Sequence, residues 1–372
     1  MFEAMFHSEN WPLAASPFWA VLFFALGGIV GSFLNVCIHR LPRGMSIVTP
    51  PSHCPHCQYS IPWYLNIPLV TWLALRGRCK NCGAPISPRY FAVELLTGAA
   101  FLACWLDFGQ NSPGRAVVYA LFLAGLIAAT FIDFEHFIIP DEITVGGLLA
   151  GFVTSLLMPS LQDARSLTGG MVRSLLGAAV GAGIVYAILR LGKWLFGRQR
   201  LHWPPETKFI FTETSLHLPD RDLPYEEVFY RKSDAIVVKA RRVELIDRGY
   251  GEAVVRLSPT RLRIEPAGAP AEEWNPECVP CLEATGSDIV LPREAMGLGD
   301  VKFMAAIGAF IGWPGVVFSL AVSSMIGAAV GVGLIALRRR EWSSRMPYGP
   351  YIALAAVLWI FGGKEIFYGL PW

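Results

Sequence analysis

The chain has 372 residues, of which 53% are hydrophobic and only 16% are charged, and its formal net charge at pH 7 is +2. A soluble domain usually carries about 25% charged residues, so this composition, with a mean hydropathy of +0.44, indicates a membrane protein. The small net charge argues against nucleic acid as a partner, because its recognition requires an extended basic surface.

The N-terminal sequence "MFEAMFHSENWPLAASPFWAVLFFALGGIVGSFLNVCIHR" contains the first apolar run. It lacks the basic segment that opens a signal peptide, and the run continues past the roughly 15 apolar residues that a signal peptide contains. We therefore expect residues 1–38 to hold a retained first membrane helix.

Further apolar runs follow, each close to the roughly 20 residues that cross a bilayer as a helix. In order, the runs lie near residues 17–38, 90–106, 116–132, 143–158, 172–196, 303–317, 318–337 and 349–362. The predicted fold class is an all-α polytopic membrane protein with about eight transmembrane helices. The sixth run is short and ends in Gly312-Trp313-Pro314, which leaves this count open by one or two.

Basic residues in two loops predict the orientation. Loop 39–89 contains six Lys and Arg residues and no Asp or Glu, and the connection after the seventh run contains four arginines. These four are Arg338, Arg339, Arg340 and Arg345. An excess of Lys and Arg marks cytoplasmic loops, and eight alternating spans place both loops on the same side. We expect both loops in the cytoplasm and both termini outside.

The polar stretch 198–292 interrupts the apolar pattern. Segments such as "AIVVKARRVELI" alternate apolar and polar residues and are rich in β-branched side chains, which is typical of strands. We expect a small β-rich cytoplasmic insert. The predicted organisation is a first helix at 1–38, a cysteine loop at 39–89, helices two to five at 90–197, the insert at 198–292 and the last three helices at 293–372.

Four of the eight cysteines form the pairs CPHC and CKNC, separated by 21 residues. They are Cys54, Cys57, Cys79 and Cys82. This spacing matches a tetrathiolate zinc site, in which each pair supplies two thiolates from one tight turn. Four cysteines leave no open position for a catalytic water, so we expect a structural, zinc-ribbon-like role. Disulfides are the alternative, which a cytoplasmic loop disfavours. The third pair, Cys278 and Cys281, could be a redox couple, half of an intermolecular site or two plain thiols, and we adopt the interpretation as plain thiols.

Two aspartates are expected at one membrane face. Asp133, in "FIDFEHFIIPDEIT", ends the third run, and Asp300, in "GLGD", precedes the sixth. Two carboxyl groups that share a site hold a single proton, so one can activate water while the other polarises a peptide carbonyl. Gly297 and Gly299 would allow close approach of backbone or substrate. The alternative is two interfacial residues, one of which caps the sixth helix.

Other polar residues have structural and functional interpretations. Asp141 follows Pro140 and is interpreted as the cap of the fourth helix. Glu94 lies in an apolar helix, and a carboxylate that is buried there needs a polar partner. Glu94 and Asn35 either pair inside the bundle or line a substrate or cofactor pocket.

Together the motifs resemble the type IV prepilin peptidases, a membrane aspartic protease family. The matching segments are "GSFLNVCIHRLP", the cysteine loop, "NIPLVTWLALRGRC", "RYFAVELLTG", "IDFEHFIIPDEIT", "MGLGDVKF" and "MPYGPYIALA". They run in family order from the first helix to the last. The resemblance does not cover about 90 residues between the fifth helix and "GLGD", which could dock a partner, bind substrate, regulate access or be a tolerated insertion.

The resemblance implies cleavage of the basic leader from type IV prepilins or type II secretion pseudopilins at the cytoplasmic face of the bacterial inner membrane. The family's catalytic aspartates fall on Asp133 and Asp300. N-methylation of the new N-terminus would use S-adenosylmethionine. Gly77 and Arg78 fall where the family often has Gly-Lys, and Glu94 is a further cofactor candidate.

Two other classes of function are compatible with parts of the sequence. A membrane thiol oxidoreductase would use the three CxxC pairs but gives no reason for "GLGD". A transport or assembly scaffold would use the polar residues of the bundle for binding. The expected partners are prepilins or pseudopilins, membrane lipid and pilus or secretion assembly proteins. The sequence leaves open the identity of the pilin, the role of 198–292 and of Cys278 and Cys281, and whether methylation is retained.

Overall fold

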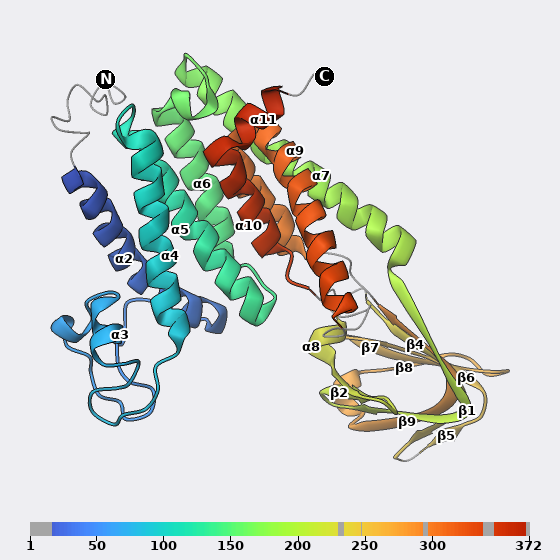
Figure 1. Ribbon diagram of the computed structural model, residues 1–372. Coiled ribbons are helices and arrows are strands. Elements are labelled where there is room, and N and C mark those ends of the chain that lie inside the picture. The colour runs from blue at the N-terminus through green and yellow to red at the C-terminus, as the bar shows by residue number, and fades with distance from the viewer. Residues whose placement is uncertain (1–16, 230–233, 247, 293–296, 338–345, 370–372) are drawn as a thin grey trace. The chain divides into compact units, whose positions relative to one another are not determined.

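The computed structural model describes residues 17–229, 234–246, 248–292, 297–337 and 346–369. The chain divides into two compact units. One comprises Met1–Tyr186 and Leu298–Trp372 and is helical, and the other comprises Ala187–Gly297 and contains a β-sheet (Figure 1).

The helical unit follows the apolar runs of the sequence. Its long helices are α2 (Pro17–Arg40), α4 (Pro88–Cys104), α5 (Pro113–His136), α6 (Asp141–Leu157), the first part of α7 (Leu167–Phe196), α9 (Leu298–Ala336) and α10 (Gly349–Leu358). Its short helices are η2 (Leu41–Arg43), η3 (Trp63–Leu65), α3 (Val70–Ala74), η5 (Pro159–Gln162) and α11 (Lys364–Gly369). Two π-helical turns, η4 (Trp105–Gly109) and η7 (Trp359–Gly363), continue α4 and α10.

Among the described residues, six helical segments are long and apolar enough to cross a membrane. They are Pro17–Arg43, Pro88–Gly109, Pro113–His136, Leu167–Leu195, Leu298–Ala336 and Gly349–Gly369. The expectation of about eight spans is therefore met only in part. The predicted fourth span is α6, whose 17 residues lie at the short end of the range of about 17 to 25 residues that crosses a bilayer as a helix. The predicted sixth and seventh spans lie in the single element α9.

A break at Gly312 divides α9. Gly312 has φ 70° and ψ 175°, which is not helical, and a positive φ of this size suits glycine because it has no Cβ. A methyl group placed on Gly308 would lie 2.9 Å from Cγ2 of Val316. Eight residues of straight helix span about 12 Å, so the chain turns back on itself at Gly312.

Side chains from neighbouring helices bind the carbonyl groups just before this break. The carbonyl oxygen of Ala309 accepts hydrogen bonds from Ser155 Oγ at 3.1 Å, Gln162 Nε2 at 2.8 Å and Ser174 Oγ at 2.9 Å. Gln162 Nε2 also donates to the carbonyl of Phe310 at 3.1 Å. The last carbonyls of a helix lack partners of their own, and inside a membrane these must come from the protein. The three side chains therefore stabilise the break.

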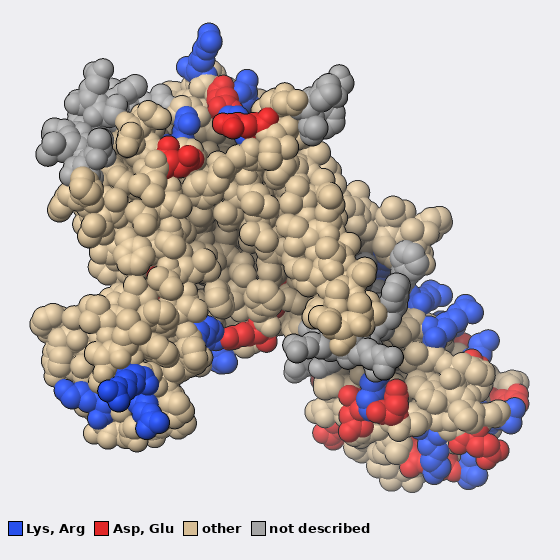
Figure 2. Space-filling view, in the orientation of Figure 1, with Lys and Arg blue, Asp and Glu red and all other residues tan. Residues whose placement is uncertain are grey.

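Charged side chains of the helical unit gather at its two ends and leave a nearly uncharged band between them (Figure 2). This pattern suits a membrane-spanning bundle, because charges are costly inside a bilayer. Arg338, Arg339, Arg340 and Arg345, on which the predicted orientation partly rests, lie outside the described residues.

The second unit is built on a nine-stranded antiparallel sheet. The strands are β1 (Arg198–Thr212), β2 (Ser215–His217), β3 (Asp222–Pro224), β4 (Ile236–Leu245), β5 (Gly249–Tyr250), β6 (Ala253–Ser258), β7 (Arg261–Pro266), β8 (Glu272–Trp274) and β9 (Cys281–Pro292). Their order is β3-β2-β1-β9-β4-β6-β7-β8, and β5 pairs with β4. The short helices α8 (Tyr225–Val228) and η6 (Pro276–Cys278) complete the unit.

One face of the curved sheet encloses the core of this unit (Figure 1). Burial alternates along the strands, as in β9, because successive side chains point to opposite faces. The register of β1 against β9 shifts between His202 and Thr207, where Pro204 and Pro205 lie. Proline cannot donate to the ladder, so its place in a long strand is at such an irregularity.

Replacing Gln162 with Leu should lower the free energy of unfolding by about 1 to 3 kcal/mol, because two buried carbonyls lose a donor. Unfolding of the detergent-solubilised protein with SDS measures this change. Gln110→Leu makes the same chemical change at an exposed position and should alter stability by less than about 0.5 kcal/mol. Equal stability of the two variants would contradict the role given to Gln162.

Candidate active site and cysteine cluster

The structure places Asp133 in the last turn of α5 with only 5% of its surface exposed. Its Oδ2 accepts a hydrogen bond of 2.9 Å from the backbone N–H of Gly349, the first residue of α10. A carboxylate is stabilised at this position because the first N–H groups of a helix have no partner in that helix and carry partial positive charge.

The contact between Asp133 and the backbone of α10 requires a residue without a side chain at position 349. A methyl group there would lie 2.7 Å from Oδ2 of Asp133 and 3.1 Å from Cδ1 of Ile139. These distances are shorter than ordinary contacts, so a larger residue would displace the carboxylate. The sequence analysis did not select Gly349, although it lies in the motif "MPYGPYIALA".

Asp300 is half-buried in the first turn of α9. The preceding Gly299 packs against Ile139, since a methyl group on Gly299 would lie 3.6 to 3.7 Å from backbone and Cβ atoms of that residue. Ile139 also contacts Gly349 beside Asp133. The two motifs therefore meet around Ile139. The contacts at Gly299 are ordinary, so backbone packing does not require glycine there, and close approach of a substrate stays a prediction.

The expected capping role of Asp141 is wrong. Helix α6 begins at Asp141 and its N-cap is Pro140, with no side-chain capping bond. The carboxylate of Asp141 instead forms an ion pair of 2.6 Å with Nζ of Lys302, in the first part of α9. Asp141 thus links the start of α6 to the start of α9, beside Asp300.

An ion pair between Arg89 and Glu135 joins α4 to α5 just beyond Asp133. His136, at the end of α5, has a buried Nε2 without a hydrogen-bond partner in the described residues. The ion pair between Arg89 and Glu135 therefore fixes α4 against α5.

The four cysteines of loop 39–89 lie together, with all four sulfur atoms within 4.8 Å of one another. Sγ of Cys54 is 3.8 Å from Sγ of Cys82, and Sγ of Cys57 is 4.0 Å from Sγ of Cys79. Thiolates converging in this way could bind a metal ion. Cys278 and Cys281 belong to no comparable group within the described ranges.

The two CxxC segments have equivalent backbones. In each, the residue after the second cysteine has a positive φ, 57° at Gln58 and 71° at Gly83. Its N–H donates to the carbonyl of the first cysteine, at 2.9 Å in both turns. Glycine suits this conformation at position 83, whereas Gln58 adopts a conformation that is uncommon for a residue with a side chain.

Hydrogen bonds to sulfur favour the thiolate form of two of these cysteines. The amide of Asn81 donates to Sγ of Cys57 and contributes most to lowering the pKa of Cys57 to about 6. Backbone N–H donation by Cys82 and then Asn81 lowers the pKa of Cys79. Thiolates are the form that binds metals, so Cys57 and Cys79 favour that form before any ion is bound. Although a backbone hydrogen bond from Ala84 lowers the pKa of Cys82, desolvation and the three neighbouring thiols raise it to about 11.

Two of the three expected cofactor residues, Gly77 and Arg78, lie in loop 39–89, and the third, Glu94, lies in α4. Their environments differ. Gly77 is buried with φ 65°, and a methyl group there would lie 3.0 Å from the ring of Trp72. The neighbouring Arg78 is exposed. Trp72 in turn packs against Phe91 of α4, with ring centroids 5.1 Å apart, so this part of the loop is held against the bundle.

Glu94 has a structural partner that the sequence analysis did not identify. It is 8% exposed, and its Oε2 accepts a hydrogen bond of 2.7 Å from the N–H of Leu69, which precedes α3. Asn35 donates separately to the carbonyl of Tyr90 at 3.0 Å. Both side chains are therefore paired with backbone groups, and Glu94 fixes the start of α3 to α4.

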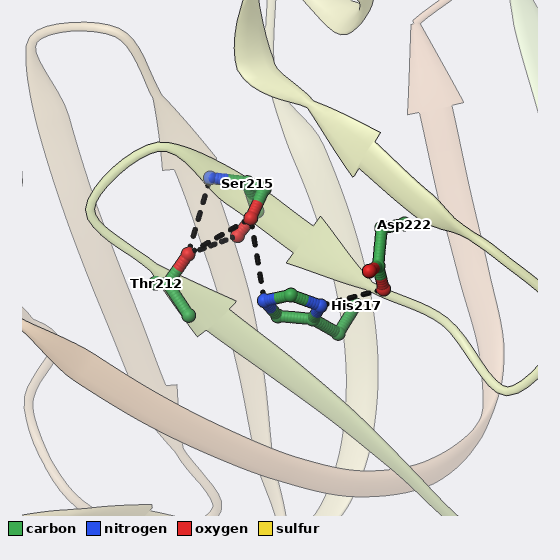
Figure 3. Close-up of polar contacts among 4 residues, drawn as sticks. All are labelled: Thr212, Ser215, His217 and Asp222. Atoms are coloured by element: carbon green, nitrogen blue, oxygen red, sulfur yellow. Dashed lines mark hydrogen bonds and ion pairs between the residues drawn. The ribbon is translucent and has the colours of Figure 1, made fainter.

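A network of polar side chains in the β-sheet unit has the order Ser, His, Asp (Figure 3). Ser215 Oγ is 3.3 Å from Nε2 of His217, whose Nδ1 is 2.6 Å from Asp222, and Thr212 contacts Ser215. His217 and Asp222 are directly paired residues of β2 and β3, and the side chain of Asp222 is 67% exposed. Cross-strand stabilisation of this hairpin explains the network.

Comparison with known protein families gives two matches. Residues 25–108 match the "Bacterial Peptidase A24 N-terminal domain", and residues 120–199 and 281–332 match the "Type IV leader peptidase family". The interruption between 199 and 281 falls within the β-sheet unit.

Similar individual proteins carry the name prepilin leader peptidase/N-methyltransferase. That of Aeromonas hydrophila is 30% identical over 370 residues, which cover 93% of this chain and 91% of the relative. That of Myxococcus xanthus is 49% identical over 168 residues, or 44% of this chain and 46% of the relative. That of Pseudomonas aeruginosa is 26% identical, covering 95% and 94%. No solved structure gives a significant match.

Replacing Gly349 with Ala should lower the free energy of unfolding by about 1 to 3 kcal/mol, because the added methyl group overlaps Asp133. Thermal unfolding of the detergent-solubilised protein measures the effect. Gly125→Ala is the control, because an added methyl group there meets no atom within 4 Å, and it should leave stability unchanged or raise it. If both alanine variants unfold alike, the packing of Gly349 against Asp133 is not a constraint.

Proposed function

The chain belongs to the type IV leader peptidase family, and we propose that it is a membrane aspartic endopeptidase that cuts the leader from type IV prepilins or type II secretion pseudopilins. One observation carries the proposal. Ile139 contacts both Gly299 and Gly349, which lie next to Asp300 and Asp133 respectively. Two carboxyl groups from distant parts of the chain are thereby brought to one end of the bundle.

In the proposed reaction, Asp133 and Asp300 share one proton. The ionised carboxylate takes a proton from water, which attacks the scissile carbonyl, while the protonated carboxyl donates a hydrogen bond to that carbonyl oxygen. Gly349 N–H holds Oδ2 of Asp133 in place. Asp133 is buried and Asp300 is half-buried, so little bulk water reaches the two carboxyl groups. Exclusion of water strengthens the electrostatic interactions of the site.

We place the active site at the cytoplasmic face of the bacterial inner membrane. The basic loop 39–89 supports this orientation. With α6 and the two halves of α9 counted separately, eight crossings put the ends of α5 and the start of α9 on the same side as that loop. The hydrophobic helix of the pilin would lie in the membrane beside the bundle and present its leader junction there.

The four-cysteine cluster fits a structural zinc ion. In a tetrahedral site with Zn–S bonds of about 2.3 Å, sulfur atoms are roughly 3.8 Å apart, and the observed separations are 3.8 and 4.0 Å. Cys54, Cys57, Cys79 and Cys82 would hold the ion and close loop 39–89 around it.

N-methylation of the new N-terminus is proposed as a second activity, with S-adenosylmethionine as methyl donor. Gly77, Arg78 and Glu94 are its candidate residues. The guanidinium of Arg78 suits the carboxylate of such a ligand, and the carboxylate of Glu94 suits its hydroxyl groups. Oε2 of Glu94 already accepts a hydrogen bond from the N–H of Leu69. When bound, the cofactor supplies an electrophilic methyl group for the free amine.

The predicted segments 1–38, 39–89, 90–197, 198–292 and 293–372 remain our proposed organisation. The insert at 198–292 is proposed to contact assembly proteins of a pilus or secretion system. Its own hydrophobic core supports folding as a separate body.

Asp133→Asn and Asp300→Asn should each reduce leader cleavage by about 10²- to 10⁴-fold, since an amide replaces the proton-transferring carboxyl. Mass spectrometry of a type IV prepilin co-expressed with each variant measures the processed fraction. Asp107→Asn, at an exposed position in η4, should cleave normally. Normal cleavage by the Asp300→Asn variant would overturn the proposed mechanism.

Replacing both Cys54 and Cys57 with Ser should reduce the metal content from about one zinc per chain to near zero, because two of four ligands are lost. Elemental analysis of the purified protein gives the stoichiometry. Cys278→Ser, outside the cluster, should retain zinc. A double variant that keeps its zinc would rule out this site.

A further inference from the structure

The helical unit contains a cavity of about 300 Å³ that the proposed peptidase mechanism does not use. Arg115 and Tyr119, in the first two turns of α5, lie on its wall. Asp133 is 18 residues beyond Arg115 on the same helix, a distance of about 27 Å along the axis. The cavity therefore lies at the end of the bundle away from the candidate active site.

Irregular backbone converges on this cavity. Gly312, where α9 turns back, lines it, as does Asp163 with φ 53°. The π-helical turns η4 and η7 contribute Phe108 and Trp359. Turns of π-helix and residues with unusual φ are concentrated at functional sites. Four separate departures from regular helix around one cavity point to a purpose beyond packing.

The cavity lining carries a net charge of +2, from three basic side chains and one acidic one. Lys364 is paired with Asp163, so the excess comes from Arg115 and Arg173. Within the described ranges, neither arginine forms an ion pair with a carboxylate. Arg115 donates to the carbonyl of Ser160 at 3.0 Å, and Arg173 donates to the carbonyls of Gln162 and Asp163 at 2.8 and 2.9 Å.

Arg115 retains unused hydrogen-bonding capacity. Its Nε is buried and has no hydrogen-bond partner among the described residues. A buried donor without a partner costs free energy, and guanidinium groups bind phosphate oxygens through paired N–H donors. The two arginines therefore present positive charge and directed donors that suit a phosphate.

The aromatic residues of the cavity place it at a membrane interface. Phe108, Trp313 and Trp359 belong to its wall, and Trp313 is 46% exposed. Aromatic side chains gather where the hydrocarbon meets the headgroups. Figure 2 shows charged side chains at both ends of the helical unit and few between them. A ligand here would have its polar group at headgroup level and its apolar part toward lipid.

From these observations we propose that the cavity binds the phosphate of an anionic phospholipid headgroup. Arg115 and Arg173 would contact the phosphate oxygens, and the aromatic wall would contact the glycerol and the first methylene groups. The volume of about 300 Å³ is at the lower limit of small-molecule sites, roughly 300 to 1,000 Å³, so it admits a headgroup and leaves the acyl chains outside. This site is independent of the proposed peptidase activity.

Native mass spectrometry of the full-length protein in mild detergent tests the proposal. Phosphatidylglycerol should bind as one tightly held molecule, at least about tenfold tighter than phosphatidylcholine with the same acyl chains, because only the former adds net negative charge. The double variant Arg115→Gln with Arg173→Gln should lose this preference. Arg165→Gln removes an exposed arginine from the same connection as Asp163 without touching the cavity and should bind as wild type.

Three outcomes would overturn the proposal. They are equal binding of the two lipids, unchanged binding by the double variant, and displacement of the lipid by millimolar inorganic phosphate, which would show a site for a soluble anion. Should the double variant fail to purify, Arg173→Gln alone decides the question. Arg173 is exposed, so its replacement is compatible with folding, and it should still weaken phosphatidylglycerol binding by severalfold.

Discussion

The structure of the helical unit depends on a break in the helix at Gly312 and on the hydrogen bonds that make the break tolerable. A membrane offers no water to the carbonyl groups that an interrupted helix leaves without partners. Ser155, Gln162 and Ser174, from three different segments, all donate to the carbonyl of Ala309. The same interactions that satisfy this carbonyl therefore fix η5, α6 and α7 against α9.

The return of the chain at Gly312 also places the two proposed sites at opposite ends of the bundle. At one end, the start of α9 lies against Ile139, and Lys302 pairs with Asp141, which brings Asp300 near Asp133. At the other end, Gly312 lines a cavity with Arg115 and Arg173. Chemistry on a peptide and recognition of a lipid headgroup can thus occupy opposite faces without sharing a residue.

Local sequence was sufficient wherever the chemistry is contained in a short segment. Two CxxC pairs with suitable spacing predict four converging thiolates, because each turn is closed by its own backbone, as the matching bonds at Gln58 and Gly83 show. The apolar runs predict the helices, and the alternation at 198–292 predicts strands, because both depend on the periodicity of neighbouring side chains. The expectations that failed or were met only in part, a cap at Asp141 and about eight spans, concern places where a partner distant in sequence decides the outcome.

The sequence by itself determined the membrane class, the helical and β segments and the cysteine cluster, and it predicted Asp133 and Asp300 as the catalytic pair. Tertiary structure alone decided that Gly349 holds Asp133, that Leu69 is the partner of Glu94 and that Arg115 and Arg173 share a cavity. Each of these contacts joins residues 25 to 216 positions apart through a backbone group or a helix end. Such pairings leave no periodic signal in the sequence, because they are set by how whole helices pack.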